Sequence, residues 1–318
     1  MNKKLTYRIF SIFLGIGIIA GLIIYAGTSE LLELLSQTSL TLLFLSILVS
    51  LFAWLFRALF LKIHTKIKFA NCFRIICIGY MLNAILPAKA GDINMIYSLK
   101  QKGVSLVRSV NILIHYRIMD LFSLLVISLP LLLIYMKNKI PENIIHYLVI
   151  IGAIITIPAL ILVDRNGLIS KLLLFLEEKI SINFLKKFIN KSHRLYSDYE
   201  ILLKTKKRWS ALISFSGWLV EGLVSYAIAI AIGYPISLYI IFLAVSLGNI
   251  SKVIPITPGG IGVYETTVML LLSIFGIPTQ ISTLLAILDH AIKTALGIIL
   301  GSISLIFSES KNPLKREA

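Results

Sequence analysis

The chain has 318 residues, of which 58% are hydrophobic and only 14% are charged, with a mean hydropathy of +0.91. Soluble globular chains are about a quarter charged, so this composition excludes an ordinary soluble domain and predicts an integral membrane protein. The net charge of +16 does not indicate nucleic-acid binding, because the basic residues lie in short segments between apolar runs. The orientation of membrane helices requires basic residues in such places.

Several apolar runs are long enough to cross a hydrocarbon core, which takes roughly 20 helical residues. Backbone groups in lipid have to be hydrogen-bonded internally, and the runs lack the alternation of a membrane barrel, so we predict an all-α fold. The first run follows a basic start and has no clear cleavage site after it, which predicts a retained span. The six predicted spans are residues 9–26, 40–61, 110–135, 144–163, 209–232 and 281–306.

The direction of the spans follows from the positive charges, because cytoplasmic loops carry the excess of Lys and Arg. The loop 27–39 has two glutamates and no basic residue and is predicted to lie outside, whereas both termini are predicted to be cytoplasmic. The stretch 164–208 is rich in Lys and Arg and partly amphipathic. It is predicted to lie on the anionic inner leaflet of the cytoplasmic membrane, or to be a solvated connector.

Two apolar segments do not fit six simple crossings. Residues 70–87 have basic residues on both flanks, so a re-entrant hairpin over 70–105 satisfies the charge rule better than a single crossing. Residues 239–275 are interrupted by prolines and glycines and are predicted to form a second hairpin that enters from the outside. In the alternative, each arm of a hairpin is a full span. This is also consistent with the predicted sidedness, because two additional crossings return the chain to the same side of the membrane.

The order of these elements predicts an inverted repeat within one membrane domain. The first unit, 40–135, and the second unit, 209–307, each contain a span, a broken hairpin and a span. Segment 1–39 holds the first span and outer loop, 136–208 a connecting span and the basic segment, and 308–318 the cytoplasmic tail. Each break has an Asn, a Pro, a Gly and a carboxylate in order: Asn83, Pro87, Gly91 and Asp92 against Asn249, Pro258, Gly262 and Glu265. Such repeats are typical of transporters, although chance similarity between two broken loops is the alternative.

Candidate functional residues lie in the two breaks and among the polar residues inside spans. Irregular backbone at membrane depth requires protein or water around it, which predicts a cavity where glycine amides bind an anion. Polar residues inside spans are costly and are functional hypotheses by default. The structural alternatives are that Glu265 favours a helix N-terminus, and that Arg117 with Asp120, and Asp289 with Lys293, form local pairs. The candidates for lipid binding or translocation are Asn83, Pro87, Gly91, Asp92, Arg117, Asp120, Glu221, Asn249, Pro258, Gly259, Gly260, Gly262, Glu265, Asp289, His290 and Lys293.

Other residues are expected to have ordinary roles. Arg57 is expected to extend to the cytoplasmic surface. Cys72 and Cys77 fit no zinc or redox spacing and are expected to be small core residues. His64 and His115 have no partners at metal-ligand spacing, so neither a metal nor a cofactor is predicted. The sequence contains no P-loop, nucleophile elbow or metalloprotease motif, so we expect no ATP-driven transport by this chain alone.

Three segments resemble the lysylphosphatidylglycerol synthase transmembrane-region family, whose members are also called flippase-like domain proteins. They are residues 83–92 (NAILPAKAGD), 116–120 (YRIMD) and 258–265 (PGGIGVYE). The family domain forms the membrane half of the multiple peptide resistance factor, so the resemblance implies an association with flipping a phospholipid. The chain differs at Tyr116, where members often have Glu, and at His290, near which members often have Arg. It ends soon after its last predicted span, so we do not expect synthase activity.

We therefore expect a non-enzymatic protein that binds and translocates a lipid with an anionic or zwitterionic head group across the cytoplasmic membrane. One alternative is an accessory subunit of a glycosyltransferase or lipid-modifying enzyme. Another is a membrane-embedded transferase, for which the sequence offers no convincing carboxylate pair or metal site. A homo-oligomer and a partner membrane enzyme both remain open, whereas no nucleic-acid partner is expected.

Overall fold

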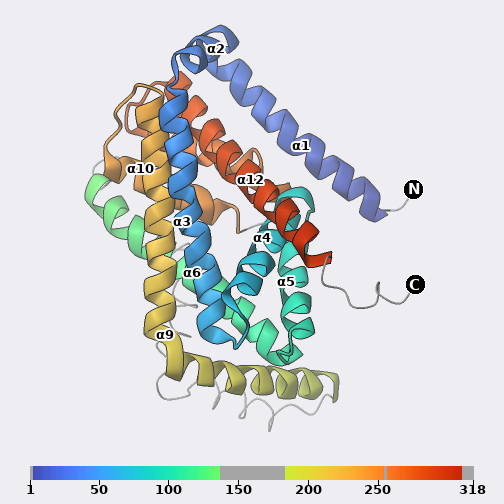
Figure 1. Cartoon of the computed structure of the whole chain (residues 1–318). Helices are drawn as coiled ribbons and strands as arrows, with labels where there is room; N and C mark the ends of the chain where they lie inside the picture. Colours follow the sequence, from blue (N-terminus) through green and yellow to red (C-terminus); the bar gives the residue numbers. More distant parts are fainter. Residues whose placement is uncertain (1–2, 137–182, 254–255, 310–318) are drawn as a thin grey trace.

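The computed structural model describes residues 3–136, 183–253 and 256–309, and shows the predicted all-α fold, with no strand in these ranges (Figure 1). The predicted span 144–163 and the first part of the basic segment 164–208 lie outside the described residues. The elements are α1 (Lys3–Ala26), α2 (Thr28–Gln37), α3 (Leu40–His64), α4 (Phe69–Ile85), α5 (Ala90–Gln101), α6 (Leu106–Met136), α9 (Asn183–Ala231), α10 (Leu238–Ser251), η1 (Pro258–Gly260), α11 (Val263–Ile274) and α12 (Thr279–Glu309).

Four described helices are long and apolar enough to cross a membrane, which makes the chain a multi-pass membrane protein. They are α3, Leu106–Ile134 of α6, Arg208–Ala231 of α9 and Thr279–Phe307 of α12. Each agrees in position with one of the predicted spans. The part of α9 before its spanning stretch lies across the foot of the bundle in Figure 1.

The first predicted span, 9–26, corresponds to α1, but the region 27–39 is a helix rather than a loop. After Gly27, which has a φ of 89° that favours glycine, α2 turns by 88° from α1. The helix forms because its leucines have an apolar surface to cover: Leu31 is buried, and Leu34 packs against the core of the second half. The two glutamates of α2 remain exposed.

Two hairpins of short helices lie between the spanning helices, where the sequence predicts hairpins 70–105 and 239–275. The first consists of α4 and α5, with 17 and 12 residues. The second consists of α10 and α11, with 14 and 12 residues, and the 3-10 turn η1 lies between them. At 1.5 Å per residue these helices are roughly 18–26 Å long, which is less than the hydrocarbon core of about 30 Å.

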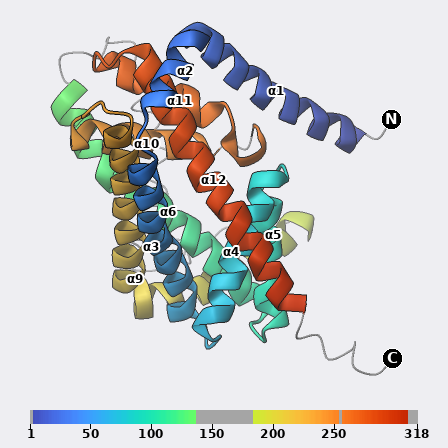
Figure 2. The ribbon, with the colours of Figure 1, turned by 45° about the horizontal axis from the view of Figure 1, so that its top comes forward.

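Helix α3 and the spanning part of α9 pack against each other in antiparallel directions (Figures 1 and 2). At one end, the amide of Ser39 donates to the carbonyl oxygen of Ala231 over 2.8 Å. At the other end, His64 Nε2 lies 2.8 Å from Ser210 Oγ. Because α4 follows the end of α3 and α10 follows the end of α9, the two hairpins start from opposite ends of the bundle.

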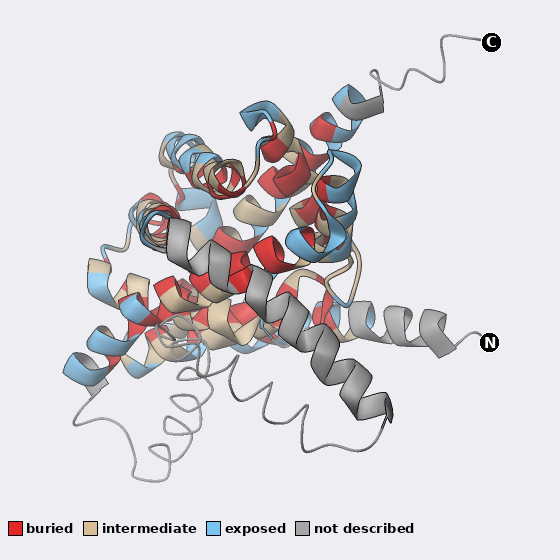
Figure 3. Cartoon of the chain, turned by 90° about the horizontal axis from the view of Figure 1, so that it is seen from below, coloured by how far each residue is buried: buried red, intermediate tan, exposed pale blue. Residues whose placement is uncertain are grey.

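Each hairpin also packs against the other half of the chain, α4 against α12 and α10 against α6. One apolar cluster joins α3 to α6, and a second joins α9 to α12 with the turn between α1 and α2. Buried residues lie in the interior, and exposed residues lie on the outer faces (Figure 3). Many exposed residues are large and apolar, such as Phe44 and Phe52 of α3, as a lipid-facing surface requires. Cys72 and Cys77 are buried and unbridged, as predicted for core residues.

Candidate functional site

The breaks of the two hairpins are in contact. The turn η1 packs against α4, and a Cβ atom added to Gly259 would lie 3.5 Å from the Cα and the carbonyl oxygen of Ala84. Gly259 has a φ of 64°, a backbone conformation that residues other than glycine rarely adopt. Glycine therefore supplies both the turn and the close approach between the two halves.

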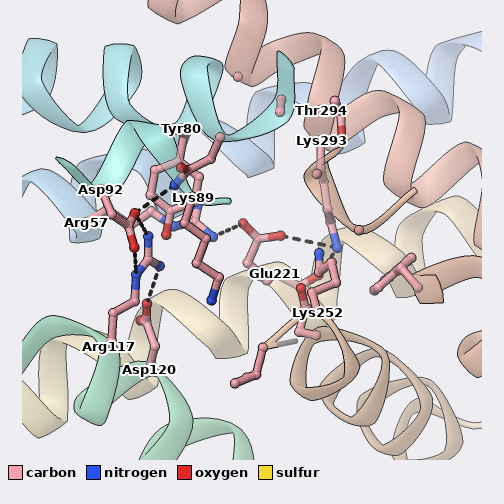
Figure 4. Close-up of a pocket in the computed structure, with 18 of the residues that line it drawn as sticks. Arg57, Tyr80, Lys89, Asp92, Arg117, Asp120, Glu221, Lys252, Lys293 and Thr294 are labelled. Carbon is pink, nitrogen blue, oxygen red and sulfur yellow. Dashed lines mark hydrogen bonds and ion pairs between the residues drawn. The ribbon is translucent and has the colours of Figure 1, made fainter. Parts of the chain in front are cut away.

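A cavity of about 610 Å³ lies at this contact and is lined by both halves of the chain (Figure 4). Such a volume is ordinary for a small-molecule site. The predicted residues that line it are Asn83, Asp92, Arg117, Asp120, Glu221, Asn249, Gly259, Gly260, Asp289, His290 and Lys293. Pro87, Gly91, Pro258, Gly262 and Glu265 are not among its lining residues and shape the breaks instead.

In the first half, the side chain of Asp92 is held by Asn83 and Arg117. Asn83 donates from Nδ2 to Asp92 Oδ1 over 2.7 Å, and its Oδ1 accepts from the amide of Gly91 over 2.8 Å. Arg117 binds both Asp92 oxygens, with 3.0 Å between Nε and Oδ2, which is a bidentate pair. Burial alone would raise the pKa of Asp92, but Arg117 and Asn83 outweigh burial and lower it. Arg117 also makes the predicted local pair with Asp120, at 3.5 Å.

In the second half, Glu265 has the corresponding position. Its Oε2 accepts from the amide of Gly262 over 2.7 Å, and its Oε1 lies 2.6 Å from Nδ1 of His290. Glu265 and His290 are 25 residues apart, and so are Asp92 and Arg117. In both halves, a carboxylate at the start of the second arm therefore reaches a cationic or titratable residue of the next span. Glu265 therefore both stabilises the N-terminus of its own helix and pairs with His290 of the last span.

Glu221 joins the two halves. Its Oε1 lies 2.6 Å from Arg57 Nη2 of α3, and its Oε2 lies 3.2 Å from Lys293 Nζ of α12. Lys293 Nζ also lies 2.8 Å from Asp289 Oδ1, which is the i,i+4 pair that the sequence predicts. Asp289 accepts further bonds from Ser225 and from the Tyr264 hydroxyl. Burying Glu221 is tolerable because two cations share it.

The prediction that Arg57 extends to the cytoplasmic surface is wrong. Its side chain is 12% exposed and lines the cavity. The guanidinium carbon lies 5.3, 5.0 and 5.7 Å from the ring centroids of Trp54, Tyr80 and Trp218. Three aromatic faces and one carboxylate therefore replace water around the cation. The only sign of the pair between Arg57 and Glu221 in the sequence was that an arginine lies in one apolar run and a glutamate in another.

The cations that line the cavity without a paired carboxylate in the described ranges are Lys89 and Lys252. Both are half-buried and lie in the breaks, outside the spanning helices. Nζ of Lys252 lies 4.4 Å from the ring centroid of Tyr264. Burial, reinforced by Lys293, lowers the pKa of Lys252 to about 8, and burial with Arg117 lowers the pKa of Lys89. The sequence did not single out either residue as part of a site, because lysines beside breaks resemble ordinary loop charges.

The glycine amides are mostly bonded within the turn. The Gly260 amide donates to the carbonyl oxygen of Thr257 over 3.1 Å, and the Gly262 amide donates to Glu265. These two amides are therefore not free for the anion binding that the sequence suggested. Asn249 also differs from its counterpart Asn83, because its Nδ2 donates to a carbonyl oxygen of its own helix. The two breaks share their carboxylates but not every detail.

Comparison with known proteins shows which sequences this chain is similar to. Residues 12–301 match the family described as the lysylphosphatidylglycerol synthase TM region. Two UPF0104 membrane proteins of Methanocaldococcus jannaschii are similar: one is 28% identical over 74% of this chain and 96% of its own length, and the other is 20% identical over 96% of both. A protein named glycosyltransferase AglD, from Haloferax volcanii, is 34% identical over 100 residues, which are 30% of this chain and 16% of that protein. No solved structure gives a significant match.

Proposed function

Because the chain belongs to the lysylphosphatidylglycerol synthase TM-region family, we propose that it binds a lipid head group in the cavity and translocates that lipid across the cytoplasmic membrane. The observation that carries the proposal is the cavity, which is rich in charge, within a bundle whose outer surface is apolar. Ionisable groups inside a membrane bundle are expensive and mark substrate pathways. A polar head group fits the interior while its acyl chains stay in lipid.

The arrangement of the helices supports a transport mechanism. We interpret the two halves as an inverted repeat, because the hairpins start from opposite ends of the bundle and carry matching carboxylate pairs. We interpret the hairpins as re-entrant, because each arm is too short to cross the hydrocarbon core alone. Transporters built in this way hold their substrate where the broken segments meet.

The paired side chains of the two breaks suggest how access alternates. Asp92 with Arg117 holds the first break to α6, and Glu265 with His290 holds the second break to α12. Each pair lies within one half and can separate without disturbing the other. We propose that loosening one pair opens the cavity toward one side of the membrane, while Glu221 keeps the halves together.

Translocation is tested by filling the cavity. Thr294 of α12 lines the cavity, whereas Ala291, on the same helix, is exposed and does not line it. Thr294→Phe should lower the translocation of labelled lipids in proteoliposomes to the protein-free rate, and Ala291→Phe should leave it unchanged. Equal rates in the two variants, both above the protein-free rate, would show that lipids do not pass through this cavity.

A second candidate function is that of an accessory subunit for a glycosyltransferase. The similarity of 100 residues to glycosyltransferase AglD favours it. An accessory subunit binds a lipid-linked substrate in the cavity without moving it. Wild-type protein that binds lipids but gives no translocation above protein-free liposomes would support this function instead.

A further inference from the structure

The charges of the cavity wall are unequal. Apart from His290, which is paired with Glu265, five cations and four carboxylates line the cavity, which leaves one surplus positive charge. An uncompensated charge is costly wherever water is excluded, so the cavity favours a negative ligand. The lining cations are Arg57, Lys89, Arg117, Lys252 and Lys293, and the lining carboxylates are Asp92, Asp120, Glu221 and Asp289.

Each of these carboxylates already has its own partners. Both oxygens of Glu221 are bonded to cations, and both oxygens of Asp92 are bonded to Arg117. Both oxygens of Asp289 accept bonds as well. Asp120 has Arg117 on one oxygen, and the Ser214 hydroxyl and the Trp218 indole, at 3.2 and 3.1 Å, on the other. A ligand ammonium group would have to share these carboxylates with the groups that already bind them.

Lys89 and Lys252 have the opposite property, since neither has a carboxylate partner in the described ranges. One belongs to the first break and the other to the second, and both side chains reach the cavity in Figure 4. An anion held by both would connect the two halves.

The mouth of the cavity indicates that this anion belongs to a lipid. Two of the apolar residues that line the cavity are themselves exposed, Ile114 of α6 at 45% and Val253 after α10 at 49%. An opening bordered by such residues suits an acyl or prenyl chain, whereas a free inorganic ion gains nothing from it.

We propose that the cavity selects lipids whose head group carries a net negative phosphate, held by Lys89 and Lys252, over lipids whose head group carries an added ammonium. This selectivity rests on the proposed lipid-binding function and specifies its substrate class. Phosphodiester phospholipids and polyprenyl phosphates share the required chemistry.

The test is a binding measurement on the full chain in nanodiscs or detergent. The probes are phosphatidylglycerol, a polyprenyl phosphate, lysylphosphatidylglycerol and inorganic phosphate. We expect at least one of the two anionic lipids to bind on the order of tenfold more tightly than lysylphosphatidylglycerol. This factor corresponds to the free energy of one charge-assisted hydrogen bond. The tighter of the two names the source of the phosphate. Inorganic phosphate binding as tightly as either would overturn the role of the lipid.

Two matched variants test the lysines. Lys252→Gln and Lys89→Gln should each weaken anionic-lipid binding on the order of tenfold, and Lys252→Arg should preserve it. Lys100→Gln changes an exposed lysine of α5 outside the cavity lining and is the control. Unchanged affinity in both glutamine variants, or tighter binding of the cationic lipid, would overturn the proposal. Translocation of the cationic lipid alone would refute this selectivity and still support transport. Selective binding of anionic lipid without translocation would support the selectivity and refute transport.

Discussion

Glu221 shows most clearly what a single residue does in this molecule. It is 4% exposed and is shared by cations from two other helices. Removing one partner from a buried pair costs about 3–5 kcal/mol, because the remaining charge is left uncompensated. We expect Glu221→Gln to lower the free energy of unfolding by this order, measured by thermal unfolding in detergent, and Glu33→Gln on exposed α2 to have no effect. If Arg57→Gln combined with Glu221→Gln costs the sum of the two single changes, the pair is not coupled.

Lys252 predicts a pH dependence. Its pKa is lowered to about 8, so it is charged below that pH and neutral above it. Affinity for a phosphodiester lipid should therefore be constant at lower pH and decline as pH rises through about 8. Lys252→Arg should abolish the decline, because arginine stays charged. If the affinity of this variant still declines, the pH dependence belongs to another group. The titratable groups that act on Lys252 are Lys293, Glu221, Asp289, Glu265 and Tyr264.

At this scale the sequence predicts local pairs better than distant ones. Asp289 with Lys293, and Arg117 with Asp120, follow from helical spacing, and both pairs form. The bond between Arg57 and Glu221 joins residues 164 positions apart. Only the packing of α3 against α9 creates it, and no local pattern encodes that packing.

At the scale of elements, the hairpin of α4 and α5 depends on one close approach. A Cβ atom on Gly91 would overlap the carbonyl oxygen of Gly79 in the facing helix. Gly91→Ala should therefore separate the arms and cost about 1–3 kcal/mol, as overpacking does. Gly21→Ala, at a helical position with open space, is the control. Thermal unfolding measures both, and equal stability of the two variants would contradict the close packing.

The elements were predictable where apolar length or proline defined them. The four long spans follow from hydropathy, and the breaks follow from Pro87 and Pro258 with their neighbouring glycines. Helix α2 was missed because ten residues with two glutamates read as a polar loop. Its leucines make it a helix only because the second half presents an apolar surface to them.

At the scale of the whole molecule, the inverted arrangement predicts sidedness. Lys102 follows α5, and Pro278 precedes α12; both are exposed. Single cysteines at these positions, in protein lacking Cys72 and Cys77, should react with an impermeant maleimide from opposite sides of the membrane. Lys102→Cys should react from the cytoplasm and Pro278→Cys from outside. Reaction of both from one side would rule out opposite entry of the two hairpins.

The surplus positive charge on the cavity wall also has a consequence for rates. An empty cavity would have to carry an uncompensated cation through a closed, water-excluded state, whereas a cavity holding an anionic head group would not. The return of the unloaded protein should then be the slow step. Unlabelled anionic lipid in the opposite leaflet should accelerate the movement of labelled lipid, so that the protein works as an exchanger rather than a one-way pump. Identical rates with and without the opposing lipid would show that the unloaded protein returns freely.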